Sequence, residues 1–177
     1  KVVGSLQEGL SGTVMAAALT ARRRELTLPV ADSRAAAGQV LEWAARGEVA
    51  LVFGNETSGL SNEEVGLCQL PVTIPTNPEF SSLNLASAVQ ILCYELRLAA
   101  GAGLPPSLGE GLAATFDEVE RMHAHLERVM VDVEFFDPAN PRRLLPRLRR
   151  LFGRTRLEKE EVAILRGLLT AVERKTK

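Results

Sequence analysis

Several features that would fix the class of a protein are scarce or missing in this chain of 177 residues. It has two cysteines, Cys68 and Cys93, without a CxxC spacing or a neighbouring histidine pair. This pattern favours neither a disulfide framework nor a zinc site. Both cysteines fall in helical patterns, and we expect them to be buried, reduced thiols of a cytoplasmic protein.

Long apolar runs and an excess of one charge are missing too. No run of about 18 apolar residues occurs, so we expect no membrane-spanning helix and no membrane partner. The net charge is −1, so the charge of the whole chain indicates neither nucleic acid nor membrane, and charge must be read locally. The first residue is Lys1 and no signal-peptide pattern follows it, so we expect the sequence to begin inside a longer protein.

What the chain does contain is a strand–helix alternation in its first hundred residues. Residues 13–19 (TVMAAAL), 49–53 and 72–74 read as short buried strands, and the last two are each followed by a polar Gly- or Pro-rich loop and a helical pattern. The alternation predicts an α/β fold with a mainly parallel sheet. Open α/β sheets bind ligands at the carboxyl ends of their strands, so the two polar loops are the expected site.

The helix starts in this part are marked by small polar residues. Ser33 is predicted to cap a helix that ends near Gly47. Ser61 and Glu64 have the spacing of a capping box before a helix over residues 62–68. Ser81 or Ser82 is predicted to cap a helix over residues 84–100, whose free backbone amides would then form part of a polar site.

The strands stop after a linker at residues 101–111, which is rich in glycine and proline. We therefore divide the chain into an α/β domain (1–100), the linker (101–111) and a helical module (112–177). The module is predicted to contain a long helix over residues 112–133 and a second helix opened by Asn140-Pro141. A third helix is predicted to be capped by Thr155 and Glu158.

The helical module has a cluster of basic residues. Seven arginines and no acidic residue lie between Pro138 and Leu157. They form either a solvated helix face paired with neighbouring acids or a contact to RNA phosphates, where arginine releases counterions. Arg22 and its two arginine neighbours allow the same two interpretations, a solvated loop or a phosphate contact.

The two polar loops match neither common phosphate-binding motif. The first loop, GNETSGLSNEE, has glycines at 54 and 59, and glycine at a strand exit permits a positive φ and close approach of a ligand. It has no Gly-Lys-Ser/Thr ending and no GxGxxG pattern, which disfavours a nucleotide-dependent oxidoreductase. Taken singly, Ser82 could be a plain helix cap and Glu56 a partner for the dipole of the next helix.

The loops together carry a family resemblance. GNETSGLSNEE followed by IPTNPEFSSLNLASAVQILCYE resembles the second and third motifs of the SpoU branch of the SPOUT RNA methyltransferases. The tail, with LRRLFGRTRLEKEEVAILRGLL, resembles the TrmJ tRNA (cytidine/uridine-2'-O)-methyltransferase subfamily. The resemblance implies a SPOUT domain with a trefoil knot at its carboxyl end, a homodimer, and S-adenosyl-L-methionine as methyl donor. The implied reaction is methylation of a ribose 2'-hydroxyl in tRNA, expected at C or U at nucleotide 32 of the anticodon loop.

The resemblance also implies roles for individual residues. The cofactor contacts carried over by position are Leu19, Thr20, Ala21, Gly54, Ile74, Ser81, Ser82 and Leu83. The catalytic positions are Glu56, Ser82 and Asn84. The RNA contacts that we expect are Arg22, Arg142, Arg143, Arg147, Arg149 and Arg150.

One part of the family pattern is absent from the sequence. The first motif, whose arginine is thought to activate or orient the ribose hydroxyl, is not found, and we expect this N-terminal part of the SPOUT domain to lie before Lys1. Two other functions therefore stay open: a SPOUT-like module that binds RNA without methyl transfer, and 2'-O-methylation of another RNA such as rRNA. No metal site is predicted, because His123 and His125 are two residues apart on a helix and do not share a face.

Overall fold

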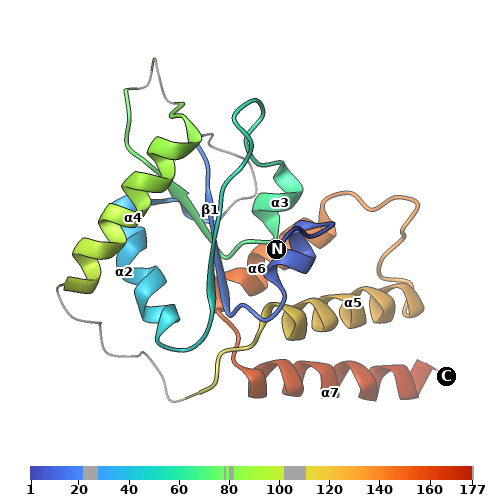
Figure 1. The fold of residues 1–177 in the computed structure, drawn as a ribbon. Helices are drawn as coiled ribbons and strands as arrows, with labels where there is room; N and C mark the ends of the chain where they lie inside the picture. The colour runs from blue at the N-terminus through green and yellow to red at the C-terminus, as the bar shows by residue number, and fades with distance from the viewer. Residues whose placement is uncertain (22–27, 78, 80–81, 102–110, 177) are drawn as a thin grey trace.

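The computed structural model describes residues 1–21, 28–77, 79, 82–101 and 111–176. The elements are α1 (Leu6–Leu10), β1 (Met15–Leu19), β2 (Ala31–Asp32), α2 (Ser33–Ala44), β3 (Val49–Val52), α3 (Asn62–Gly66), β4 (Leu70–Thr73), α4 (Leu85–Gly101), α5 (Phe116–Asp132), α6 (Leu144–Thr155) and α7 (Lys159–Thr176). An α/β part and a following helical part are therefore confirmed (Figure 1).

The sheet is parallel and is built around β1. Its four strands run in the order β2-β4-β1-β3, and Ala17 of β1 pairs with Leu51 on one side and Leu70 on the other. Figure 1 shows α2 and α4 on one side of the sheet and α3 and α6 on the other. Both faces of β1 are buried, and its alanines leave room for helices to pack closely. The short strand β2 was not predicted, because residues 29–32 read as a connector.

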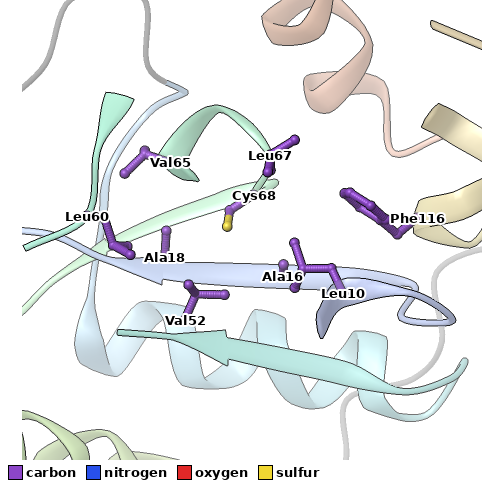
Figure 2. Packing of buried hydrophobic residues seen from close by; sticks show 9 residues of the cluster. All are labelled: Leu10, Ala16, Ala18, Val52, Leu60, Val65, Leu67, Cys68 and Phe116. Atoms are coloured by element: carbon purple, nitrogen blue, oxygen red, sulfur yellow. The ribbon is translucent and has the colours of Figure 1, made fainter. Parts of the chain in front are cut away.

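The helical part docks on the sheet through Phe116. This first residue of α5 belongs to a cluster of buried residues with Leu10, Ala16 and Cys68, and Figure 2 shows its ring pointing toward Leu10 and Ala16. Its backbone N–H donates to the carbonyl of Thr13 at 2.7 Å. The two parts of the chain thus share a hydrophobic core, and their division into separate domains stays a prediction.

Ion pairs hold the helices of the tail together. α5 and α7 lie side by side and run in the same direction (Figure 1), with Arg128 bonded to Glu173 at 2.9 Å. α6 is tied to α5 by a two-pronged pair in which Arg149 donates to both carboxylate oxygens of Glu120. Two parallel N–H···O bonds fix the orientation of both side chains as well as their distance.

The helix starts of the α/β part agree with prediction at one position and differ at another. The Ser61–Glu64 capping box is confirmed, with both reciprocal hydrogen bonds present. The prediction for Ser33 was wrong: Asp32 caps α2 by accepting from the Ala35 N–H at 2.8 Å, and Ser33 is a buried residue of the first turn. A carboxylate at this position satisfies an open amide and also complements the helix dipole.

In the tail, the observed helix starts differ more from the predicted ones. The long helix begins at Phe116 rather than at residue 112, with a capping box formed by Thr115 and Glu118. The predicted start at Asn140-Pro141 was wrong, because Arg142 has a φ of 47° and α6 begins only at Leu144. A left-handed residue cannot continue a right-handed helix.

The predicted cap of the last helix was also wrong. Thr155 is the final residue of α6, and its hydroxyl donates to the carbonyl of Phe152. The backbone N–H of Glu158 is instead satisfied by the carboxylate of Glu161 at 2.9 Å.

The predicted linker is only partly visible. Gly101 is the last residue of α4, residues 102–110 lie outside the described part of the chain, and the carbonyl of Gly111 accepts from Arg46 at 2.7 Å. The trefoil knot stays a prediction. No helix among the described residues is long and apolar enough to cross a membrane.

Candidate active site

A cavity of about 160 Å³ lies where β1, β3 and β4 end. Its lining includes the predicted cofactor residues that the structure describes, namely Leu19, Thr20, Ala21, Gly54, Ile74, Ser82 and Leu83. Ser81 lies outside the described residues. The cavity therefore brings together residues from three strand ends that are distant in sequence, as expected for the carboxyl edge of a parallel sheet.

The first loop, residues 54–60, is closed by its own backbone. Asn55 Oδ1 accepts from the backbone N–H groups of Thr57 and Ser58 at 3.1 and 2.7 Å. The Gly59 N–H returns to the Asn55 carbonyl at 2.9 Å, and Gly59 has a φ of 68°. Only Gly59 therefore uses the positive φ that glycine permits at this loop.

Gly54 is required for a different reason. A Cβ built at this residue would lie 2.2 Å from the carbonyl carbon of Gly59 and 2.3 Å from the nitrogen of Leu60. A side chain at position 54 would therefore overlap the backbone of the same loop. Glycine here lets the chain fold back on itself at the wall of the cavity.

The second loop is joined to the first at the start of α4. Asn84 Oδ1 accepts from the Ser87 N–H at 2.8 Å, so Asn84 is the cap of α4. The prediction that Ser82 caps this helix was wrong, and Ser82 is an exposed residue of the cavity lining. Glu56 Oε1 accepts from the Leu85 N–H at 3.3 Å, so its helix partner is α4 rather than the next helix in sequence.

The end of the first strand, β1, is fixed by a backbone hydrogen bond. Thr20 is buried, and its N–H donates to the carbonyl of Val72 at 2.8 Å, which holds the exit of β1 against β4. Leu19 and Ala21 flank it on the cavity wall.

The composition of the lining suits a ligand with an apolar ring and a positive charge. Phe53, Ile74 and Leu83 supply apolar surface, and Glu56 is the one charged residue among the described lining. S-adenosyl-L-methionine carries an adenine ring and a sulfonium cation, so its chemistry fits this set of groups. Phe53, Asn55, Ser58 and Ala88 line the cavity but were not predicted individually. Their position beside the predicted loop residues is the signal that could have found them.

The predicted RNA-binding arginines lie elsewhere. None of the described ones lines the cavity, and Arg22 lies outside the described residues. Arg142 and Arg147 are exposed, whereas Arg149 is paired with Glu120 and Arg150 is half-buried. Arg143 is exposed but has an interaction of its own. The set therefore divides into outward-facing arginines and arginines used inside the fold.

The cysteines and histidines show how burial changes ionisation. Burial, with a smaller contribution from Glu64, raises the pKa of the Cys68 thiol to about 12. Cys93 is exposed on α4, so the prediction that both cysteines are buried was wrong for this one.

Burial, reinforced by Arg149, lowers the pKa of His123 to about 4, which leaves it neutral at pH 7. In the described part of the chain, no group of three or more His, Cys, Asp or Glu side chains is placed to hold a metal ion.

Comparisons with known proteins identify the relatives of this chain. The profile of the SpoU rRNA Methylase family matches residues 8–94, and that of the tRNA methyltransferase TrmJ, C-terminal domain, matches residues 117–177. The chain is 46% identical to the tRNA (cytidine/uridine/adenosine-2'-O-)-methyltransferase TrmJ of Pseudomonas aeruginosa, over 98% of this chain and 72% of that protein. It is 41% identical to the tRNA (cytidine/uridine-2'-O-)-methyltransferase TrmJ of Yersinia enterocolitica, over 99% of this chain and 70% of that protein.

A solved structure shows the same fold. The crystal structure of TrmJ from Z. mobilis superposes with a TM-score of 0.81 at 32% identity, covering 98% of this chain and 73% of that one. A probable methylase family protein from Haemophilus influenzae superposes with a TM-score of 0.55 at 35% identity, covering 99% and 72%.

Proposed function

Because this chain belongs to the TrmJ family of tRNA 2'-O-methyltransferases, we propose that it transfers a methyl group from S-adenosyl-L-methionine to a ribose 2'-oxygen of tRNA. The observation that carries the proposal is the cavity at the strand ends, lined by residues from three strand exits and including one carboxylate. Ser82 and Leu83 would complete the cofactor contacts from the second loop.

The residues of the cavity would act mainly by positioning. Bound S-adenosyl-L-methionine supplies an electrophilic methyl group, so the protein chiefly has to align the hydroxyl oxygen with it. Alignment of two reactants can contribute roughly 7–11 kcal/mol. Asn84 is not in the described lining, but its neighbours Leu83 and Leu85 are. Its side-chain oxygen is occupied by the helix cap, which leaves its amide N–H₂ to orient the ribose or a neighbouring group. Ser82 is exposed in the lining and offers a hydroxyl for the same task.

Glu56 has a different part in this proposal. Its carboxylate holds the start of α4 against the first loop through Leu85, so it fixes the two loops relative to each other. It also places a negative charge in the lining, where a sulfonium cation would be stabilised. Deprotonation of the hydroxyl is not assigned to a residue of this chain, since the arginine of the family's first motif has no counterpart in it.

The substrate is proposed to be cytidine or uridine at nucleotide 32 of the tRNA anticodon loop. The name of the Pseudomonas relative adds adenosine to these two bases, and methylation of tRNAs with C, U or A at this nucleotide measures the base preference. The family name SpoU rRNA Methylase keeps ribosomal RNA as a second candidate substrate.

A homodimer is part of the proposal, and α4 supports it. This helix exposes Leu85 and Val89 near its start and Tyr94 and Leu98 near its end, of which Tyr94 is 56% exposed. The two residues of each pair are four apart and so lie on one side of the helix, and exposed apolar pairs of this kind are typical of a surface that another chain covers. The knot and the cytoplasmic location are likewise proposals that rest on family membership.

The site assignment can be tested with two variants of one residue. Asn84→Asp keeps an oxygen that can cap α4 but removes the amide N–H₂, whereas Asn84→Ala removes both. If the amide orients the acceptor, methylation of tRNA by the natural protein falls in both variants. In that case calorimetry still shows S-adenosyl-L-methionine binding to Asn84→Asp. If Asn84 is only a cap, Asn84→Asp keeps full activity, and this result would contradict the catalytic assignment.

A further inference from the structure

A second and larger cavity lies at the opposite end of the sheet. It has a volume of about 960 Å³ and is lined by residues at the start of β1 and β4, including Met15 and Leu70, together with residues of α3 and α6. Figure 1 shows α6 between α3 and α5. Cavities of this size are large enough for a small organic ligand. The cofactor cavity lies at the carboxyl ends of the same strands, so the two cavities are separate sites.

The walls of this cavity combine aromatic rings with arginines. Trp43, Phe116 and Phe152 line it, and the arginines of the lining are Arg143, Arg149, Arg150 and Arg156. The lining also includes Glu63 and Glu120, so the described lining carries more positive than negative charge. His123 lines it as well and is neutral at pH 7, since burial lowers its pKa to about 4.

Two buried donors in the lining have no acceptor. Trp43 is 3% exposed, and its Nε1 has no hydrogen-bond partner. The Nε of Arg150 is also buried without a partner, and no ion pair joins Arg150 to another described residue. Buried donors are nearly always satisfied in folded proteins, and leaving one unsatisfied is costly. Trp43 Nε1 is enclosed by protein, whereas Arg150 is half-buried in the lining, so its guanidinium can meet acceptor atoms of a ligand.

The other arginines of the lining are occupied differently. Arg149 is committed to Glu120. Arg156 donates to Gln39 at 2.6 Å and stacks over the ring of Trp43 at 5.7 Å. Arg143 has an interaction of its own. Arg150 is therefore the arginine of this wall that is placed to meet a ligand anion.

We propose that this cavity binds one nucleotide of an RNA strand, with its base against the half-buried rings of Phe152 and His123 and its phosphate on Arg150. Single-stranded RNA is read by bases that stack on aromatic rings and guanidinium planes, and arginine matches the geometry of phosphate. The exposed Arg142 and Arg147 lie just before and on the same helix, where they would contact the strand outside the cavity. The identification of the strand as tRNA rests on the proposed function; the nucleotide chemistry does not.

The chain carries its own reporter for this site, because Trp43 is its single tryptophan. Titration of the chain with 5'-nucleoside monophosphates, and separately with tRNA, should change Trp43 emission until saturation. Inorganic phosphate alone and nucleosides alone should act much more weakly, because each supplies only half of the ligand. Saturation by monophosphates without a response to tRNA would assign the site to free nucleotides and overturn the RNA-strand assignment.

Variants of single arginines distinguish nucleotide binding in this cavity from a general effect of positive charge. Arg150→Ala should weaken nucleotide binding at least about tenfold, as expected for loss of a hydrogen bond to a charged group. Arg150→Lys should recover part of it, and Arg147→Ala, on the same helix but outside the cavity, should leave monophosphate binding unchanged. Thermal melting of each variant checks that the fold is kept.

The cofactor site provides an independent control. S-adenosyl-L-methionine binding should be the same in Arg150→Ala and in the unmodified chain, because the cavities lie at opposite ends of the sheet. Failure to bind S-adenosyl-L-methionine would count against the proposed function and not against this site. A Trp43 emission that does not respond to nucleotides or tRNA, or an Arg150→Ala variant of unchanged affinity, would overturn the proposal.

Discussion

Gly54 shows how a single missing Cβ shapes the cofactor cavity. The loop after β3 returns so closely that its backbone occupies the space of a side chain at this position. Gly38, in the interior of α2, is the opposite case, because a Cβ there would meet no atom within 4 Å. The two glycines therefore differ in what an added methyl group would do.

We expect Gly54→Ala and Gly38→Ala to change stability in opposite directions. Overpacking costs about 1–3 kcal/mol, so Gly54→Ala should lower the free energy of unfolding by at least that amount and weaken S-adenosyl-L-methionine binding. Gly38→Ala should raise the free energy of unfolding by up to about 1 kcal/mol, since alanine favours a helix interior. Urea denaturation measures both. A Gly54→Ala variant as stable as the parent would show that the loop does not pack as described.

His123 predicts a pH dependence of stability. Its pKa is lowered from 6.5 to about 4 by burial and by Arg149, so the folded state resists protonation. The stability that depends on neutral His123 is fully present above pH 6.5 and is lost as the pH falls toward 4. Between pH 7 and pH 5 the loss should be roughly 2 kcal/mol.

Replacing His123 isolates this contribution. In His123→Gln the free energy of unfolding should vary less between pH 7 and pH 5, a range that lies above the titration of the carboxylates Glu118 and Glu173, whose pKa values are both lowered in the fold. Thermal melts at matched ionic strength give the comparison. An equally steep pH profile in the variant would mean that another group is responsible.

At the level of elements, helix ends show what sequence spacing can predict. Ser61 and Glu64 form the expected capping box, because each side chain reaches the backbone N–H of the other within the first turn. Thr155 and Glu158 have the same spacing, yet Thr155 ends α6 instead. α6 continues through Thr155 and contacts α5 through Arg149 and Phe152, and a local pattern carries no information on such contacts.

Contacts between helices also decide which arginines of α6 are exposed and which are used inside the fold. Seven arginines in a short stretch predicted a basic surface, but Arg149 is committed to Glu120 on α5. Which arginine turns inward depends on where α5 lies, and this was not readable from the sequence. Arg147 remains exposed and is the natural control for Arg149.

Arg149→Ala and Arg147→Ala should therefore separate folding from surface charge. Loss of the two-pronged pair, which is about one-third exposed, should lower the free energy of unfolding by about 1 kcal/mol. Arg147→Ala should change it by less than about 0.5 kcal/mol, as is usual for surface substitutions. Chemical denaturation gives both values. Equal stability of the two variants would mean that the pair contributes nothing to holding α6.

RNA binding, unlike stability, should depend more on the exposed arginines than on Arg149. Combined Arg142→Ala and Arg147→Ala substitutions should weaken tRNA binding and make its salt dependence shallower by roughly one unit of slope per lost phosphate contact. Binding measured at several salt concentrations gives the slope. An unchanged slope would assign these arginines to solvation or to subunit contacts.

For the molecule as a whole, the site was more predictable than the packing around it. Strand exits of a parallel sheet meet at one edge, so Leu19, Gly54 and Ile74 could be expected to share a cavity before the fold was known. The link between Glu56 and Leu85 and the docking of Phe116 on the sheet join residues far apart in sequence, and no local pattern indicates them. The large cavity beneath α6 is lined by both the sheet and the helical part, so it could not be expected without the docking of Phe116.

Methyl transfer to ribose is the central claim, and one assay tests it most directly. The natural protein is incubated with tRNA and S-adenosyl-L-methionine labelled in its methyl group, and the tRNA is then hydrolysed with alkali. A 2'-O-methyl group blocks cleavage at its own nucleotide, so the label should be recovered in an alkali-resistant dinucleotide that contains C or U at position 32. Label found only in mononucleotides, or no label in tRNA although the cofactor binds, would contradict the account.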